Sequence, residues 1–194
     1  MTLRYEQVID DQDIATLAQV ADEIWHEYWP DRIGMAQTDY MIEQFQSVAA
    51  LTRDIREHHY LYYLVYDPYH NLVGYTGGCA EHFENDPFCA RACTHGTAIA
   101  QRSSTRLFIS KIYLYKEQRG KHYASRIIEF WEECAQNEDL NTLYLTVNKD
   151  NELAIRAYLG RGFEILEAHT GDIGQGFVMD DYIMAKAVSL TPTR

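Results

Sequence analysis

The sequence predicts one α/β domain, residues 1–194, built on a single mixed and largely antiparallel β-sheet that is flanked by helices. Three observations lead to this class. The chain has 194 residues, 46% of them hydrophobic, which is enough for one well-buried core. Runs of β-prone residues alternate with stretches of helical periodicity. One helix separates the strands predicted over 107–115 and 142–147, and such a crossover favours parallel pairing.

The N-terminal region predicts a strand followed by a helix. Residues 3–9 form the strand. The stretch 10–13 is rich in N-cap residues, and residues 14–28 carry apolar side chains at helical spacing. Pro30 and Gly34 end this helix.

A second helix and a hairpin are predicted next. Thr38 or Asp39 caps the helix, which runs to Ile55. The β-prone stretches 59–66 and 72–80 flank a polar turn, so we expect them to pair as a hairpin.

Glycines mark the second strand of this hairpin. Gly74, Gly77 and Gly78 indicate a bulge or the close approach of another group. The segment 81–105 then lacks clear periodicity, and loops of that length are commonly functional or mobile.

The C-terminal half alternates strands and helices. Strands are predicted over 107–115, 142–147, 163–167 and 182–187, and helices over 119–137 and 152–159. Gly160 and Gly162 stop the last helix in the manner of a C-cap.

Composition narrows the classes of function. The formal net charge of −12 disfavours a nucleic-acid partner and would attract cations such as polyamines or basic peptides. The alternative is that the acidic charge serves only to keep the protein soluble. No apolar run reaches membrane-span length and the start turns polar at once, so we expect a soluble cytoplasmic protein without a membrane partner. Cys79, Cys89, Cys93 and Cys134 are expected to be free thiols, and their spacing does not predict a metal site.

A basic turn precedes the helix predicted over 119–137. Helix starts present free backbone N–H groups and the positive end of the helix dipole, which suits a pyrophosphate. Arg119 and Lys121 add positive charge and Ser125 adds a hydroxyl group. A solvated basic helix start without a ligand is the alternative for this turn taken alone.

With its flanking segments, this turn resembles the pyrophosphate motif Q/R-x-x-G-x-G/A of the GNAT superfamily, the Gcn5-related N-acetyltransferases that use acetyl-CoA. The motif falls on Arg119, Gly120, Lys121, His122, Tyr123 and Ala124. Ala124 keeps the final small residue, whereas His122 replaces the central glycine. That glycine normally lets the backbone approach the phosphate, so the backbone amides serve here only if the His122 side chain points outward.

A second motif resembles the same superfamily. The pattern N-x-x-N-x-x-A-x-x-x-Y matches Asn148, Asn151, Ala154 and Tyr158. The resemblance implies that the two asparagine amides bind the pantetheine arm of the cofactor. It also implies that Tyr158 protonates the departing CoA thiolate; a core position is the alternative for this tyrosine.

The resemblance also assigns the neighbouring strands. The strand over 142–147 is expected to splay from its parallel neighbour, so that the pantetheine arm enters the gap. Backbone groups of Ile112, Tyr113 and Leu114 are expected to bond the pantetheine and the acetyl carbonyl group.

The N-terminal half and the late stretch GDIGQGFVMDDYIMAK resemble bacterial diamine (spermidine/spermine) acetyltransferases. In this superfamily the first two helices and the late loop form the wall of the acceptor site. The expected wall residues are Trp25, Tyr28, Trp29, Tyr40 and the pair Asp180–Asp181. The alternative is that the aromatic residues belong to the core and the acids to the solvated surface.

Several groups are candidates for the base that takes the amine proton. Glu81, with His82 beside it, leads because the glycine-rich strand should end near the acyl group. Glu27, His26 or a chain of water molecules are the alternatives.

Together these features predict an acetyl-CoA-dependent N-acetyltransferase acting on a small-molecule primary amine, with a polyamine preferred, by direct attack. No cysteine or serine has the setting of a covalent nucleophile. Acetylation of a protein or peptide and a non-catalytic CoA-binding or regulatory module are the alternatives. A homodimer is possible from the superfamily.

Overall fold

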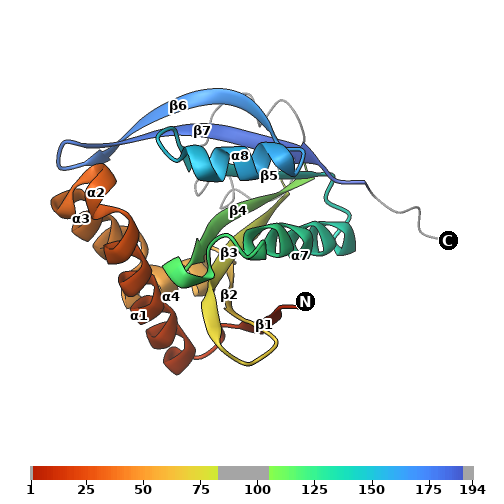
Figure 1. The fold of residues 1–194 in the computed structure, drawn as a ribbon, viewed down its shortest axis with the longest axis horizontal. Coiled ribbons are helices and arrows are strands. Elements are labelled where there is room, and N and C mark those ends of the chain that lie inside the picture. Colours follow the sequence, from red (N-terminus) through yellow and green to blue (C-terminus); the bar gives the residue numbers. More distant parts are fainter. Residues whose placement is uncertain (1, 83–104, 190–194) are drawn as a thin grey trace. The chain divides into compact units, whose positions relative to one another are not determined.

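The computed structural model describes residues 2–82 and 105–189, and within them seven strands form one mixed sheet (Figure 1). The strand order is β1-β2-β3-β4-β5-β7-β6, antiparallel except for the parallel pair β4–β5. The strands are β1 (Arg4–Gln7), β2 (Leu61–Tyr66), β3 (Leu72–His82), β4 (Thr105–Leu114), β5 (Thr142–Asn148), β6 (Glu164–Gly174) and β7 (Phe177–Ala187). The fold class predicted from the sequence is confirmed.

Helices account for most of the remaining described chain. They are α1 (Asp11–Tyr28), α2 (Pro30–Ile33), α3 (Met35–Phe45), α4 (Val48–Glu57), α7 (Tyr123–Asn137) and α8 (Glu152–Gly160), with a short 3-10 turn η1 (Lys116–Gln118). Within the described residues, no helix is long and apolar enough to cross a membrane.

The chain divides into two compact units. The first contains residues 2–78 and 111–126, and the second contains 79–82, 105–110 and 127–189. β3, β4 and α7 each contribute residues to both units. The assignment of the whole chain to one domain stays a prediction.

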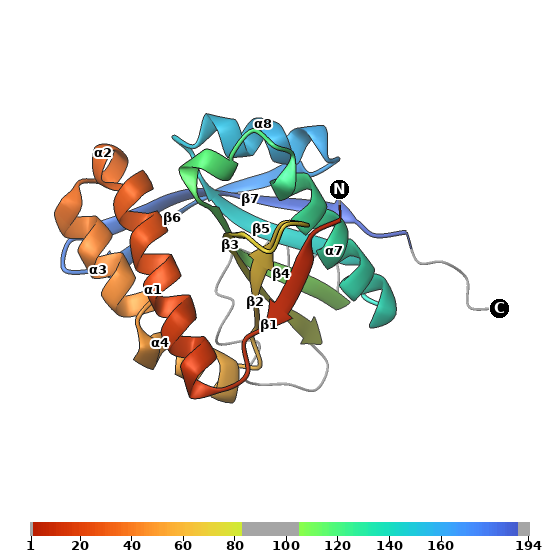
Figure 2. The ribbon, with the colours of Figure 1, turned by 60° about the horizontal axis from the view of Figure 1, so that its bottom comes forward.

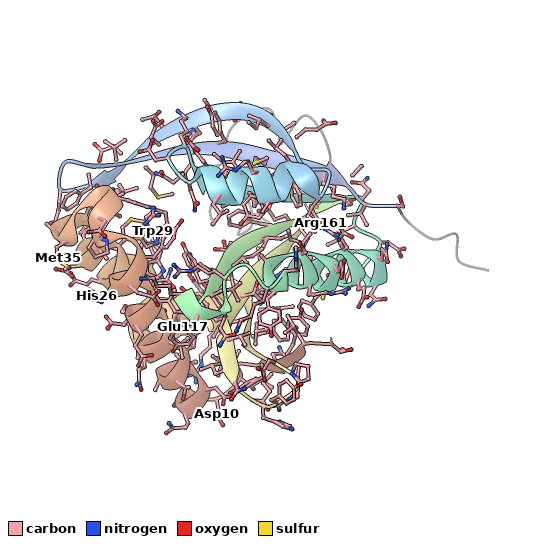
Figure 3. The ribbon with its side chains drawn as sticks, viewed as in Figure 1. Asp10, His26, Trp29, Met35, Glu117 and Arg161 are labelled. Atoms are coloured by element: carbon pink, nitrogen blue, oxygen red, sulfur yellow. The ribbon has the colours of Figure 1, made fainter. Side chains whose placement is uncertain are left out.

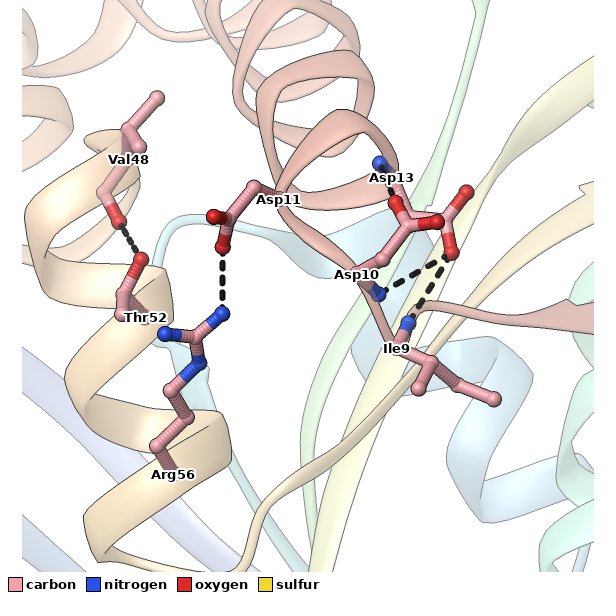
Figure 4. Close-up of polar contacts among 7 residues, drawn as sticks. All are labelled: Ile9, Asp10, Asp11, Asp13, Val48, Thr52 and Arg56. Atoms are coloured by element: carbon pink, nitrogen blue, oxygen red, sulfur yellow. Dashed lines mark hydrogen bonds and ion pairs between the residues drawn. The ribbon is translucent and has the colours of Figure 1, made fainter.

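In the first unit, α1 begins with a complete capping box. The Asp10 side chain accepts from the Asp13 N–H at 2.9 Å, and the Asp13 carboxylate accepts from the Ile9 and Asp10 amides (Figure 4). Arg56 of α4 pairs with Asp11 in the same first turn. Helices α1, α3 and α4 pack together and lie side by side in both ribbon views (Figures 1 and 2).

The prediction of a single second helix was wrong, because two helices, α3 and α4, cover this stretch and the short α2 precedes them. Pro30 starts α2, and Gly34 adopts a φ of 81° between α2 and α3. Thr38 does not cap a helix; it is buried inside α3 and donates to the Gly34 carbonyl at 2.8 Å. Ser47 caps α4 instead, accepting from the Ala50 N–H.

The hairpin β2–β3 forms as predicted, and its glycines have the expected close neighbours. Asp67 closes the turn by accepting from the Tyr69 and Asn71 amides. A Cβ atom on Gly74 would overlap the Tyr113 carbonyl group, and one on Gly77 would lie 2.6 Å from the Tyr62 ring. Gly74 also has a φ of 153°, so both space and backbone conformation require glycine there.

In the second unit, the parallel pair and the last helix follow the sequence prediction. Residues 106–109 of β4 pair in parallel with 142–145 of β5. α8 ends with Gly162 at a φ of 85°; the Gly162 N–H bonds to the Leu159 carbonyl and the Phe163 N–H to the Tyr158 carbonyl. This is the Schellman pattern, so the C-cap prediction is confirmed.

The late stretch of the chain differs from the prediction, which had short strands and a loop. β6 and β7 form one long hairpin, the long blue ribbons of Figure 1. Its tip is formed by Gly174, Gln175 and Gly176, all with positive φ. Glycines and exposed polar residues weaken the alternation of apolar and polar side chains that would predict long strands in this stretch. The extended conformation of β6 depends instead on its pairing with β7.

We expect Gly74→Ala to reduce the free energy of unfolding by more than about 2 kcal/mol, because the new methyl group overlaps the backbone of Tyr113. Gly160→Ala is the matched control, since a Cβ atom there meets no heavy atom within 4 Å and alanine favours the helix. Urea denaturation of the two variants measures the difference. Equal stability of both would contradict this account of Gly74.

Candidate functional site

The turn between β4 and α7 lies in the first unit and is strongly bent. After η1 the chain passes through Gly120 (φ 78°) and His122 (φ 62°) before α7 begins at Tyr123. A left-handed conformation costs a non-glycine residue roughly 1–2 kcal/mol. His122 adopts it nonetheless, and its side chain is exposed. At this position, where the superfamily motif has glycine, His122 therefore adopts a backbone conformation that glycine would adopt without this energetic cost.

A hollow of about 350 Å³ lies at this turn, lined by Lys121, His122, Tyr123 and Arg126. Two of these side chains are cations. The first-turn amides of α7, which include those of Ala124 and Ser125, have no acceptor inside the helix. The two cationic side chains, the first-turn N–H groups and the positive end of the α7 dipole together favour the binding of an anion. The residues present therefore fit the pyrophosphate of CoA.

Arg119 is held by three neighbours in the first unit. Its Nε donates to the Leu114 carbonyl at 3.0 Å, and its guanidinium lies 3.4 Å from the Glu27 carboxylate. The same group lies 4.6 Å from the centre of the Tyr28 ring. Arg119 thus links the turn to the end of α1, a positioning contact that the sequence did not indicate.

The end of β4 contributes to an aromatic cluster. Tyr113 stacks on Tyr75 with ring centres 5.3 Å apart, and Trp25 lies 5.4 Å from Tyr113. The Trp25 indole donates to the Tyr75 hydroxyl group at 3.1 Å. Ile112 and Leu114, the other predicted strand residues, are half-buried.

The four aromatic residues predicted for the wall of the acceptor site have different environments. Trp25 and Trp29 are buried, at 3% and 8% exposure, whereas Tyr28 and Tyr40 are half-buried. Tyr28 faces Arg32 as well as Arg119. Trp29 lies near the end of α1 (Figure 3), and its buried indole N–H has no hydrogen-bond partner among the described residues.

In the second unit, the two motif asparagines make local hydrogen bonds. Asn148 ends β5, and its side-chain oxygen accepts from the Asp150 N–H at 3.0 Å. Asn151 is the N-cap of α8 and accepts from the Ala154 N–H at 3.3 Å. Both oxygens therefore shape the β5–α8 connection, which gives these residues a structural role besides the predicted one.

Tyr158 lies on α8, seven residues after Asn151 as the motif requires. Its side chain is half-buried, and its ring centre is 5.8 Å from that of Phe163. Its carbonyl group belongs to the C-cap of α8.

Glu81 is fully buried within the second unit. Its carboxylate accepts from the Arg106 Nε at 2.6 Å and from the Tyr144 hydroxyl group at 2.5 Å, so each carboxylate oxygen has a partner. Arg106 is 1% exposed. This geometry favours a structural role over that of a base. Sequence reasoning missed Arg106 and Tyr144, although an arginine directly before the apolar residues LFI of a predicted strand is a signal for a buried pair.

Two other base candidates, His26 and Glu27, are also engaged. His26 bonds Asp39 and the Asp22 carbonyl, each at 3.0 Å, and the hydrogen bond to Asp39 raises the pKa of His26 (labelled in Figure 3). A raised pKa keeps the ring protonated to higher pH, so less of the neutral form that can accept a proton is present at a given pH. Glu27 accepts from the Lys116 N–H and lies near Arg119.

One further acid has the environment of a base. Asp181 of β7 is 6% exposed, and burial, with a smaller effect from Asp180, raises the pKa of its carboxyl group to about 6. Asp180 is exposed and pairs with Lys149 and Thr170. The structure thus separates the two acids that the sequence had grouped.

The predictions about thiols and metals are tested only in part. Cys79 and Cys134 are free cysteines, while Cys89 and Cys93 lie outside the described residues, as does most of the segment 81–105. Among residues 2–82 and 105–189, no group of three potential metal ligands occurs.

Solved structures with the same fold include several acetyltransferases, and no curated protein matches the chain. The PaiA N-acetyltransferase of Thermoplasma acidophilum, in complex with coenzyme A, is 16% identical, with a TM-score of 0.66 over 96% of this chain and 99% of the other. Arabidopsis thaliana NAA60, in complex with a bisubstrate analogue, is 13% identical, with a TM-score of 0.64 over 98% and 100%. The spermidine/spermine N-acetyltransferase SpeG of Vibrio cholerae is 17% identical, with a TM-score of 0.58 over 96% and 94%.

The mixed sheet with its parallel β4–β5 pair is the fold of these acetyltransferase structures. The sequence model of the Acetyltransferase (GNAT) family matches residues 21–163, well over half of the chain. The chain therefore belongs to the GNAT family of acetyltransferases, which use acetyl-CoA.

We expect Arg106→Met to reduce the free energy of unfolding by about 3–5 kcal/mol, because it leaves the Glu81 carboxylate buried without its cation. Adding Glu81→Gln removes the buried charge and keeps an acceptor for Tyr144, so the double variant should recover at least half of the loss. Urea denaturation at pH 7.5 measures both. A single variant as stable as the wild type would refute the structural role of the pair.

Proposed function

We propose that this protein transfers an acetyl group from acetyl-CoA to a small-molecule primary amine by direct attack, with a polyamine as the preferred acceptor. Membership of the acetyltransferase family is the observation that carries the proposal. Bound acetyl-CoA supplies the activated acetyl group and a thiol leaving group.

In the first unit, the turn residues are proposed to hold the cofactor phosphates. The hollow lined by Lys121, His122, Tyr123 and Arg126 supports this role, since two cations and the first-turn amides meet there. Gly120 contributes the bend, and the backbone of Ile112–Leu114 is proposed to bond the pantetheine and the acetyl carbonyl group.

In the second unit, Asn148, Asn151 and Tyr158 are the proposed pantetheine and leaving-group residues. Their spacing in the family motif supports the assignment. The side-chain oxygens of both asparagines serve the β5–α8 connection, so their amide N–H groups are the atoms proposed to bond the cofactor.

The preference for a polyamine rests on charge and on the resemblance of the N-terminal half to the diamine branch. A formal net charge of −12 attracts cationic acceptors. One neighbour in fold is a spermidine/spermine N-acetyltransferase, and another, the NatC complex, was crystallised with a Gag peptide and CoA, so a peptide acceptor is the alternative within the same reaction.

The test is release of CoA thiol from acetyl-CoA across a panel of amines, with the mass shift of the acceptor as the second readout. We expect acetylation of spermidine or a related diamine in preference to peptides and amino sugars. Calorimetric binding of acetyl-CoA without thiol release on any amine would refute the enzyme and favour a non-catalytic CoA-binding module.

For Tyr158→Phe we expect a loss of roughly 10²–10³-fold in kcat, because the thiolate no longer receives its proton from the phenol. The hydroxyl group is the only atom removed, so the contact with Phe163 and the Tm should change little. Full turnover with an unchanged pH profile would show that Tyr158 is not the acid.

A further inference from the structure

One face of the second unit carries polar residues from three neighbouring strands. Asp181 of β7 lies directly opposite Asn148 of β5 and directly opposite His169 of β6. Opposed residues of antiparallel strands share a face, with Cβ atoms roughly 4.5–5.5 Å apart. The three side chains therefore form a row on the same face, beside the end of β5.

Asp181 is buried in this row, and no hydrogen bond to its side chain comes from the described residues. It is 6% exposed, and it makes no ion pair with any described residue either. A buried carboxylate without a partner is costly, and proteins retain such groups chiefly where a ligand completes them.

A second acid lies on the same face. Glu167 precedes His169 by two residues on β6, so alternation places both on one side of the strand. One carboxylate oxygen of Glu167 is buried and has no hydrogen-bond partner among the described residues. Two carboxylates that lack partners suit a ligand with a positive charge and several N–H donors.

The charges around Asp181 come from its own strand and from both neighbours. Burial is the main effect that raises the pKa of Asp181, and Asp180 raises it further. His169 and Lys149 lower this pKa by less. Lys149 is bonded to Asp180 and lies over the Tyr182 ring, and these two residues alternate with Asp181 along β7, so this cation belongs to the opposite face. The His169 ring lies toward Gly171, where a Cβ atom would be 3.3 Å from its Nε2.

We propose that Asp181 is the catalytic base of this enzyme, and that Asp181 and Glu167 together bind the ammonium group of the acceptor. The inference rests on the proposed function and deepens it, because it names the residue that takes the proton and requires a cationic amine. Asn148 and His169 border the same position.

The proton balance explains why such a base is needed. The acceptor arrives as R–NH₃⁺ and leaves as an N-acetyl amide, so its nitrogen loses two protons. The Asp181 carboxylate takes the first and releases it to water. The N–C bond then forms as the C–S bond breaks, and the second proton goes to the CoA sulfur.

The raised pKa suits this step. An alkylammonium group has a reference pKa of about 10.4, so an ordinary aspartate near 3.9 is a weak acceptor for its proton. At about 6 the proton transfer is easier by roughly two pKa units, while the carboxylate is still ionised at neutral pH.

The first experiment measures kcat/KM for spermidine between pH 5 and 9 in the wild type, Asp181→Asn and Asp172→Asn. For the wild type we expect kcat/KM to rise with pH through an inflection near pH 6, as the carboxyl group loses its proton. Asp181→Asn should lose the inflection and at least roughly 10²-fold in kcat/KM. Asp172→Asn removes the same charge from an exposed site on the same hairpin and should stay within about twofold.

Folding is checked independently. A buried acid with a raised pKa binds its proton more tightly in the folded state, so folding stability falls as pH rises from about 4 to 6. Asp181→Asn should therefore keep or raise the Tm at pH 8. A loss of activity with such a Tm cannot come from unfolding.

A second experiment needs no turnover. The Asp181 carboxyl carbon, followed by ¹³C NMR without acetyl-CoA, should titrate well above an ordinary aspartate and shift to lower pKa when spermidine is added. An ordinary pKa that spermidine leaves unchanged would overturn the proposal.

The two proposals fail in different ways. A wild type that acetylates no amine refutes the proposed function, and the role of Asp181 falls with it. A wild type that acetylates spermidine while Asp181→Asn keeps its rate and its pH profile overturns only the role of Asp181.

Discussion

The second unit depends on a buried ion pair between Glu81 and Arg106, completed by the Tyr144 hydroxyl group. These side chains come from β3, β4 and β5, so one polar contact joins three strands. An ion pair in a low-dielectric core offsets its desolvation only when the geometry is good and the remaining hydrogen bonds are made. Here both oxygens of the Glu81 carboxylate are hydrogen-bonded. Because a shift of β3, β4 or β5 would leave this buried carboxylate unpaired, the contact helps to fix the register of the three strands.

Several polar side chains elsewhere in the described residues also make the hydrogen bonds or ion pairs that offset their removal from water. Asn148 and Asn151 shape a turn and cap a helix, and Arg119 bonds a carbonyl group, a carboxylate and an aromatic face. In residues 2–82 and 105–189, the buried side-chain atoms without a hydrogen-bond partner are the Trp29 indole nitrogen, the Gln46 amide nitrogen, the Arg161 Nε and one oxygen of Glu167. Asp181 is buried as well, and no described residue bonds its side chain. A buried polar group without a partner costs stability, so each of these groups needs an explanation that the described residues do not supply.

Much of the fold was predictable because local signals agreed with it. The β2–β3 hairpin, the capping box of α1 and the glycine at the end of α8 all follow from residues close together in the sequence. The break between α3 and α4 and the full length of the β6–β7 hairpin were not predicted. The first is marked by a local signal, the Ser47 N-cap of α4, which the sequence prediction did not use. In the second, pairing along β7 outweighed weak local preferences.

By itself, the sequence determined the family of this protein, through the motif at 148–158 and the turn at 119–124, because both signals depend on residue type at fixed spacing. It also indicated why Gly74 must be glycine. Only the tertiary structure decided the environments of the acids. Glu81 became a buried partner of Arg106, and Asp181 was separated from Asp180 by the alternation of β7. The reason is that burial and cross-strand neighbours set the properties of a carboxyl group, and both arise from strands distant in the chain.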